Sequence, residues 1–108
     1  MIDFIFLGDS LTFGYGVKPK DNWVHKLSEY LKLNILNKGV NGNTTTDMLF
    51  RFYEDVVSNS PKSLFIMGGT NDLLSNIPVS KIIENMEVMI KEAFAKNIKV
   101  IIGIPPVI

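Results

Sequence analysis

The chain has 108 residues, a length that suits one small domain and is too short for two ordinary ones. With 46% hydrophobic residues and a mean hydropathy of +0.20, the composition excludes a disordered chain. Eleven basic and eleven acidic side chains cancel, and the lack of a Lys/Arg cluster gives no support for a nucleic-acid partner or an anionic membrane surface.

The residue types narrow the possible chemistry further. Cysteine is absent, which excludes disulfides, thiolate metal sites and cysteine nucleophiles, and the single histidine, His25, leaves no imidazole-rich metal site. The apolar runs are far shorter than the roughly 20 residues of a membrane span. The N-terminus lacks a basic start followed by an apolar stretch, so we expect a cytoplasmic protein, with the mature form of an exported protein left open.

Short apolar runs alternate with amphipathic segments along the chain. We expect strands at residues 2–7, 33–36, 63–67 and 98–104, because each run ends at Gly, Asn or Pro. Apolar side chains recur at helical spacing over residues 23–31, 45–58 and 80–96, and Asn97 suits the left-handed residue that ends a helix. This order predicts one α/β domain over residues 1–108: a doubly wound, flavodoxin-like parallel sheet with helices on both faces, in three α/β/α layers.

The end of the chain is unusual for a complete domain. Residues 104–108 resemble the end of a strand entering a loop, so we expect a domain that is cut short after its fourth strand. A last strand without a covering helix leaves apolar surface open, which predicts self-association of the 108-residue chain.

Three polar, glycine-rich segments follow the first three predicted strands, at residues 8–12, 37–44 and 69–72. In open parallel sheets, ligands bind outside the carboxyl ends of the strands. The sequence therefore predicts that these segments meet at one edge of the sheet and form the functional site.

Each candidate residue in these segments has a simpler structural interpretation when it is taken alone. Ser10 suits a helix N-cap, Gly42 suits a turn with positive φ, and Asn71 suits a turn. In a functional interpretation, Ser10 presents its hydroxyl at a helix N-terminus that favours developing negative charge. The bare backbone N–H of Gly42 and the side-chain amide of Asn71 would then donate to a substrate oxygen.

Taken together and in this order, the segments resemble three motifs of the GDSL esterase/lipase family, also called the SGNH hydrolases. The sequence Gly-Asp-Ser-Leu at 8–11 matches the nucleophile block as it stands. Asn-x-Gly-x-x-Gly-x-Thr at 37–44 is similar to the second block, and Gly-Thr-Asn-Asp at 69–72 matches the third. The resemblance covers nearly the whole chain, from Phe4 to about Ile104.

This resemblance implies acyl transfer on a small ester or thioester. Ser10 would attack the carbonyl and form an acyl-enzyme, which water then hydrolyses. The backbone N–H groups of Ser10 and Gly42 and the side-chain amide of Asn71 would form the oxyanion hole. Asp9 and Asp72 would hold the loops as hydrogen-bond acceptors. The chemistry needs no metal or organic cofactor.

The sequence departs from the family pattern in one respect. The fourth block, a C-terminal Asp-x-x-His that supplies the base, is absent, and His25 falls in the first predicted amphipathic helix, away from the loops. We therefore expect these residues to be the N-terminal part of a longer hydrolase and to be nearly inactive alone. The alternatives are a non-catalytic flavodoxin-like binding module or a pseudoenzyme, although neither phosphate-binding fingerprint is present.

Overall fold

The computed structural model describes residues 1–105 and contains a four-stranded parallel sheet. Its strands are β1 (Phe4–Gly8), β2 (Ile35–Gly39), β3 (Ser63–Met67) and β4 (Lys99–Ile102), in the order β2-β1-β3-β4. The chain thus builds outward from β1 in both directions, as a doubly wound sheet does. The loop that the sequence predicts at the chain end includes residues 106–108, which lie outside the described residues.

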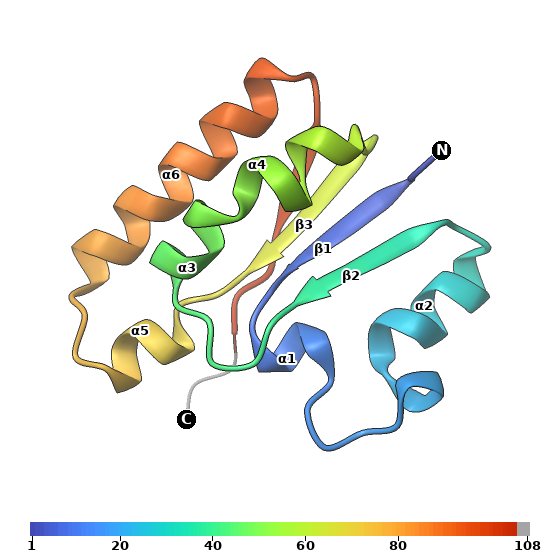
Figure 1. Cartoon of the computed structure of the whole chain (residues 1–108), viewed down its shortest axis with the longest axis horizontal. Coiled ribbons are helices and arrows are strands. Elements are labelled where there is room, and N and C mark those ends of the chain that lie inside the picture. Colours follow the sequence, from blue (N-terminus) through green and yellow to red (C-terminus); the bar gives the residue numbers. More distant parts are fainter. Residues whose placement is uncertain (106–108) are drawn as a thin grey trace.

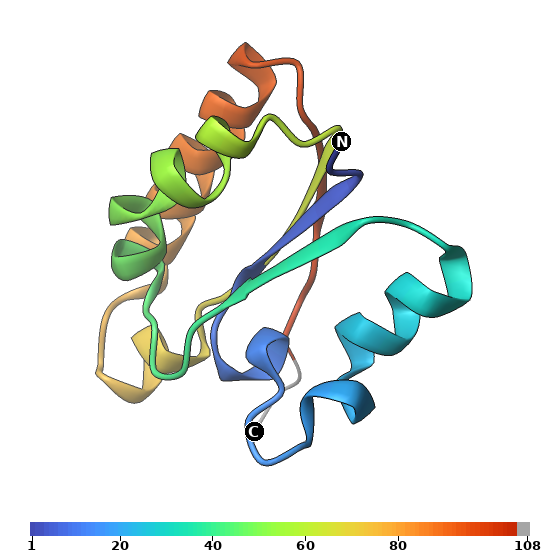
Figure 2. The same cartoon turned by 45° about the vertical axis from the view of Figure 1, so that its right-hand side comes forward.

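Helices cover both faces of the sheet (Figures 1 and 2). On one face lie α1 (Ser10–Phe13) and α2 (Trp23–Leu31), with a 3-10 turn, η1 (Pro19–Asp21), between them. On the other lie α3 (Thr45–Phe50), α4 (Phe52–Asp55) and α6 (Val79–Ala95), while the short α5 (Thr70–Leu74) follows β3 and η2 (Val57–Asn59) follows α4. The predicted three-layer α/β/α fold class is confirmed.

The main core lies between the sheet and α3, α4 and α6. Every second strand residue, such as Ile5, Leu7 and Leu64, meets side chains from these helices, because residues two apart in a strand point to the same face of the sheet. The whole buried cluster comprises Ile5, Leu7, Met48, Phe52, Val56, Leu64, Ile66, Met89, Ala93 and Ile98. On the opposite face, the Trp23 ring packs 5.5 Å from the ring of Phe6 between centroids. Two hydrophobic layers therefore hold the sheet in place.

The structure contradicts the single helix predicted over residues 45–58. The helix is interrupted at Arg51, whose φ of −100° and ψ of 7° leave the helical region, and α4 begins at the next residue. Met48, Phe52 and Val56 nevertheless remain buried at the predicted spacing of four. At this interruption, the Arg51 guanidinium donates to the carbonyls of Gly8 and Lys38, at the carboxyl ends of β1 and β2.

The second strand also begins and ends later than residues 33–36. Parallel pairing with β1 extends β2 through the polar residues Asn37 and Lys38 to Gly39. Backbone pairing to a central strand thus outweighs the hydrophobic pattern. Asn97, with φ of 58°, adopts the predicted left-handed conformation after α6.

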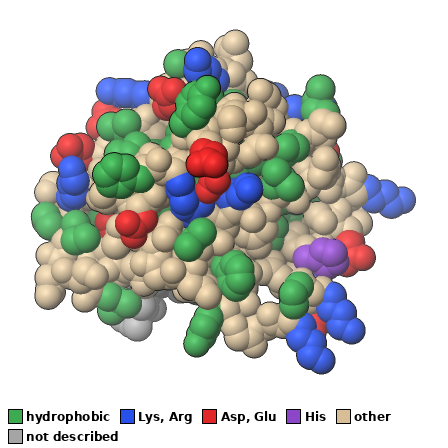
Figure 3. Space-filling view, viewed as in Figure 1, with side chains coloured by type: hydrophobic (Ala, Val, Ile, Leu, Met, Phe, Trp, Pro, Cys, Tyr) green, Lys and Arg blue, Asp and Glu red, His purple; other side chains and the backbone are tan. Residues whose placement is uncertain are grey.

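The surface shown in Figure 3 has no extended area of one charge, because Lys and Arg side chains lie among Asp and Glu side chains there. None of the helices within residues 1–105 combines the length and the apolar character needed to cross a membrane.

Candidate active site

The register of the sheet aligns the ends of three strands. Gly8, at the end of β1, pairs with Gly39 of β2 on one side and with Met67 of β3 on the other. Ser10, Gly42 and Asn71 each follow shortly after one of these paired residues. The three predicted loops therefore leave the sheet along one edge, where Figure 1 shows α1, α5 and the β2–α3 connection.

Ser10 is the first residue of α1. Its neighbour Asp9 is the N-cap residue and accepts a hydrogen bond from the backbone N–H of Leu11 at 3.0 Å. Ser10 is half-buried, and its own N–H belongs to the first turn, where backbone donors have no partner within the helix. Ser10 is therefore not the cap, and the capping role that a serine here would ordinarily take is filled by Asp9.

The end of β2 supports α1 directly. The side-chain amide of Asn37 donates to the Thr12 carbonyl at 2.8 Å, and its oxygen accepts from the Gly39 N–H at 2.9 Å. A Cβ atom at Gly39 would lie only 2.2 Å from the backbone nitrogen of Phe13. Glycine at this position thus lets α1 rest against the strand end.

Gly42 lies in a tight turn between β2 and α3. The Asn43 N–H donates to the Val40 carbonyl at 3.2 Å across the turn, and Gly42 has a φ of +78°. This φ favours glycine, whereas no heavy atom lies within 4 Å of where a Cβ would be. Gly42 is exposed, and the Val40 N–H that begins its turn donates to the carbonyl of Gly8, two residues before Ser10.

Asn71 connects the third loop to the second. Its side-chain nitrogen donates to the Asn43 carbonyl at 2.9 Å. The amide group carries two hydrogens, and this bond uses one of them. The structure thus brings Asn71 against the turn that contains Gly42, and leaves one amide hydrogen for another acceptor.

Asp72, the residue after Asn71, joins the same loop to the start of α3. Its side chain is fully buried, and its two oxygens accept from the backbone N–H of Thr45 at 2.8 Å and from the Thr45 hydroxyl at 2.6 Å. Asn85 of α6 completes the network by donating to the Thr45 hydroxyl oxygen at 3.0 Å. The start of α3 and the start of α5 are thereby joined.

Sequence reasoning did not find Thr45 and Asn85. One signal was available for Asn85, since it stands four residues before the buried Met89 and therefore on the buried face of α6. A polar side chain on a buried helix face needs a hydrogen-bond partner, and here the partners are the hydroxyls of Thr45 and Thr46.

The loop around Ser10 also holds unpaired polar atoms. Among the described residues, Asp9 Oδ2 and Thr12 Oγ1 are the buried side-chain oxygens that lack a hydrogen-bond partner. Buried polar groups are nearly always paired, and departures from this rule tend to occur at functional sites. The position of both atoms beside Ser10 agrees with a site at this edge.

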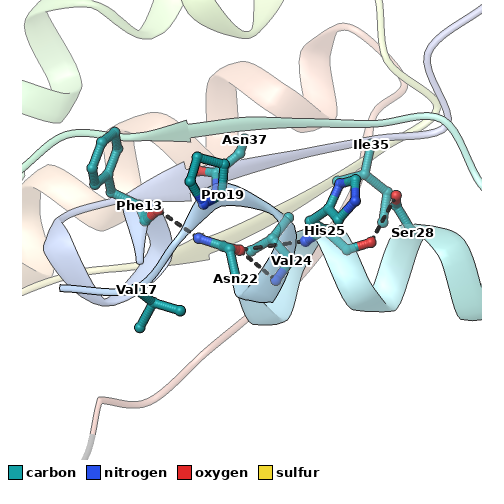
Figure 4. A pocket seen from close by; sticks show the side chains of 9 residues that line it. All are labelled: Phe13, Val17, Pro19, Asn22, Val24, His25, Ser28, Ile35 and Asn37. Atoms are coloured by element: carbon teal, nitrogen blue, oxygen red, sulfur yellow. Dashed lines mark hydrogen bonds between the residues drawn. The ribbon is translucent and has the colours of Figure 1, made fainter. Parts of the chain in front are cut away.

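His25 lies elsewhere. It lines a pocket on the α2 side of the sheet together with Phe13, Val17 and Asn37, among others, and Ser10 is not part of that lining (Figure 4). Its Nε2 lies 3.3 Å from Glu29 Oε1 one helical turn away, and the side chain is half exposed. His25 thus interacts within its own helix.

Comparison with known proteins agrees with this geometry. The model of the GDSL-like lipase/acylhydrolase family matches residues 6–108. The chain belongs to this family. The resemblance noted from the three sequence motifs is therefore confirmed, and the α/β fold is the one that solved members share.

Three similar proteins illustrate how the family relates to this chain. The lipoprotein YqeF of Bacillus subtilis is 38% identical, over 93% of this chain and 46% of its own length. The arylesterase of Vibrio mimicus is 29% identical, over 94% of this chain and 55% of its own. AlinE4, a solved esterase of the SGNH-hydrolase family, superposes with a TM-score of 0.85 at 28% identity, covering 94% of this chain and 58% of its own. The chain thus spans about half the length of the curated relatives it matches.

Proposed function

We propose that these residues carry the nucleophile and the oxyanion hole of a serine ester hydrolase. The observation that carries the proposal is the meeting of three loops at one sheet edge, with Asn71 bonded to the turn that contains Gly42. Ser10 is the first residue of α1, which follows β1 at the same edge of the sheet. The esterase names of the Vibrio mimicus relative and of AlinE4 support the same activity.

The proposed reaction has two acyl-transfer steps. A base takes the hydroxyl proton of Ser10 as Oγ bonds to the carbonyl carbon of the substrate. The negative oxygen of the tetrahedral intermediate accepts hydrogen bonds from the N–H groups of Ser10 and Gly42 and from the Asn71 amide. The ester C–O or thioester C–S bond then breaks, and the leaving group takes the proton. Water attacks the acyl-enzyme in the same way and regenerates Ser10.

Residues 1–108 contain no histidine placed to act as this base, because His25 pairs with Glu29 on α2. Loss of the base histidine lowers kcat on the order of 10⁶-fold in a serine protease. We therefore propose that the 108-residue chain alone is nearly inactive, and that activity requires an Asp-x-x-His block such as the family carries. Asp9 and Asp72 would support the loops, since both accept hydrogen bonds from backbone N–H groups.

The substrate class is a small acyl ester or thioester, with lysophospholipids, acyl thioesters, acetyl esters and acetylated sugars all compatible with this chemistry. The cytoplasmic location inferred from the sequence stays a prediction, as does the lack of a nucleic-acid partner. The chemistry proposed here uses backbone and side-chain groups of the chain alone, without a cofactor.

A serine-directed fluorophosphonate probe and p-nitrophenyl acetate test the proposal in a protein that carries these residues together with the base. We expect labelling at Ser10, and Ser10→Ala should abolish both labelling and hydrolysis. Ser28→Ala is the matched control, because the Ser28 hydroxyl donates only to the His25 carbonyl within α2. Hydrolysis retained by the Ser10→Ala variant would remove Ser10 from the mechanism. Nucleotide-dependent thermal stabilisation without labelling would support the binding module instead.

A further inference from the structure

Arg51, at the interruption between α3 and α4, has no role in the reaction proposed above, although it contacts the same loops. Its guanidinium donates to the Gly8 carbonyl at 2.9 Å, to the Lys38 carbonyl at 2.8 Å and to Asn43 Oδ1 at 2.7 Å. The remaining bond reaches Asp55 Oδ2 at 2.7 Å. The Arg51 side chain is only 19% exposed, so these bonds lie largely out of water.

The three inner acceptors lie on the segments that form the candidate site. Gly8 ends β1 and directly precedes Asp9 and Ser10, and its carbonyl also accepts from the Val40 N–H at 3.0 Å. Lys38 lies near the end of β2. Asn43 follows Gly42 in the turn, and its own carbonyl accepts the hydrogen bond from the Asn71 amide.

The chemistry of the guanidinium explains how one side chain makes all of these bonds. Arginine carries five N–H donors in a rigid plane, whereas lysine carries three donors on a single nitrogen. Arg51 is the only arginine among the eleven basic residues, and the other ten are lysines. Lysine could keep the charge at this position but not reach acceptors on both strand ends and on the turn together.

We propose that Arg51 is a positioning residue for the oxyanion hole. Its bonds connect the turn of Gly42 and Asn43 to the end of β1, which leads to Ser10. Because the Asn43 carbonyl accepts from the Asn71 amide, Arg51 also positions that amide. This inference rests on the proposed ester hydrolase function. Arg51 is not assigned a contact with the substrate in this role, because four of its five N–H donors already bond to Gly8, Lys38, Asn43 and Asp55.

The first test is made on the 108-residue chain by NMR. In Arg51→Lys, we expect the side-chain amide signals of Asn71 to shift and the backbone N–H of Asn43 to exchange with solvent roughly tenfold faster. Asp55→Asn is the matched control, since it removes the outer ion pair and keeps an oxygen acceptor; it should leave both signals unchanged. If Arg51→Lys also leaves them unchanged while circular dichroism shows a folded protein, Arg51 does not hold the turn.

A second variant keeps the test decisive if Arg51→Lys does not fold. Asn43→Ala removes the side-chain acceptor of Arg51 but keeps the carbonyl that receives the Asn71 amide. We expect it to shift the Asn71 signals as well, because the turn loses its link to Arg51. If the chemical shifts of the Asn71 side-chain amide are unchanged in Asn43→Ala, the proposal is overturned.

Kinetics then separate positioning from a purely structural role. In a hydrolytically active protein that carries these residues, Arg51→Lys should lower kcat roughly tenfold to a hundredfold, with KM within about threefold. A kcat equal to that of the unsubstituted protein would overturn the positioning role. If the unsubstituted protein does not hydrolyse p-nitrophenyl acetate, the proposed function fails, and the NMR result still decides whether Arg51 holds the turn.

Discussion

Asp72→Asn is the substitution that most directly tests how the candidate site is held together. Asp72 is fully buried, and its two oxygens accept from the backbone N–H and the hydroxyl of Thr45. Asparagine has nearly the same shape but only one oxygen, and its NH₂ group cannot accept a hydrogen bond. The substitution therefore removes an acceptor without creating a cavity.

The structure sets the size of the effect. If the remaining oxygen keeps the Thr45 N–H, the new NH₂ faces the Thr45 hydroxyl, whose oxygen already accepts from Asn85. The hydroxyl hydrogen of Thr45 is then left without its acceptor. Hydrogen bonds to charged groups contribute about 1.5–3 kcal/mol, so we expect the free energy of unfolding to fall by about 2–3 kcal/mol. The free energy of unfolding of a typical domain is about 5–15 kcal/mol, so the variant should still fold.

Urea unfolding followed by circular dichroism measures this loss. With a slope of about 1–3 kcal/mol per molar urea, the midpoint should fall by about 0.7–3 M. Asp21→Asn is the matched control on the exposed turn η1 and should change the free energy by less than about 0.5 kcal/mol. Combining Asp72→Asn with Thr45→Val should show coupling of about 1–2 kcal/mol. A loss for Asp72→Asn no larger than that of the control, or strict additivity with Thr45→Val, would refute the reasoning.

Three further predictions follow from other contacts. Gly39→Ala should displace α1 and lower the free energy of unfolding by about 1–3 kcal/mol, because its Cβ would lie 2.2 Å from Phe13 N; an unchanged melting temperature would contradict this. Thr44→Ala should cost about 1 kcal/mol in urea unfolding, since Thr44 and Asp47 form the capping box of α3, and an unaltered midpoint would argue against that role. We also predict that the 108-residue chain self-associates through the apolar groove of about 560 Å³ along α6, where Ile83 and Phe94 are exposed. Light scattering should show a dimer or larger species that Phe94→Glu reduces, and a monomer at every concentration would count against it.

Much of the architecture was predictable because it depends on patterns that are local in the sequence. The spacing of Trp23, Leu27 and Leu31 predicts α2 with the bounds that the structure shows. The apolar stripe of residues 80–96 predicts α6 to within a residue at each end, and Asn97 has the expected positive φ. Helical periodicity and end signals arise from neighbouring residues, so they can be recognised without the fold.

The candidate site was predictable in its main residues, but not in what holds them. Ser10, Gly42 and Asn71 stand in recognisable motifs, and their roles remain predictions. The bonds of Asp72 to Thr45 join residues 27 positions apart, and the bond of Arg51 to Gly8 joins residues 43 positions apart. Distant pairs of this kind leave no periodic signal, because the partners become neighbours only when parallel strands align their ends.

The same reason explains two of the differences between the predicted and the observed elements. The pattern of residues 45–58 fits one helix, and only the acceptors at the ends of β1 and β2 reveal why the helix is interrupted at Arg51. The polar residues of β2 become strand only because β1 pairs with them. Local preference thus decided which segments form helices and strands, whereas hydrogen bonding between distant segments decided where they end and how the site is assembled.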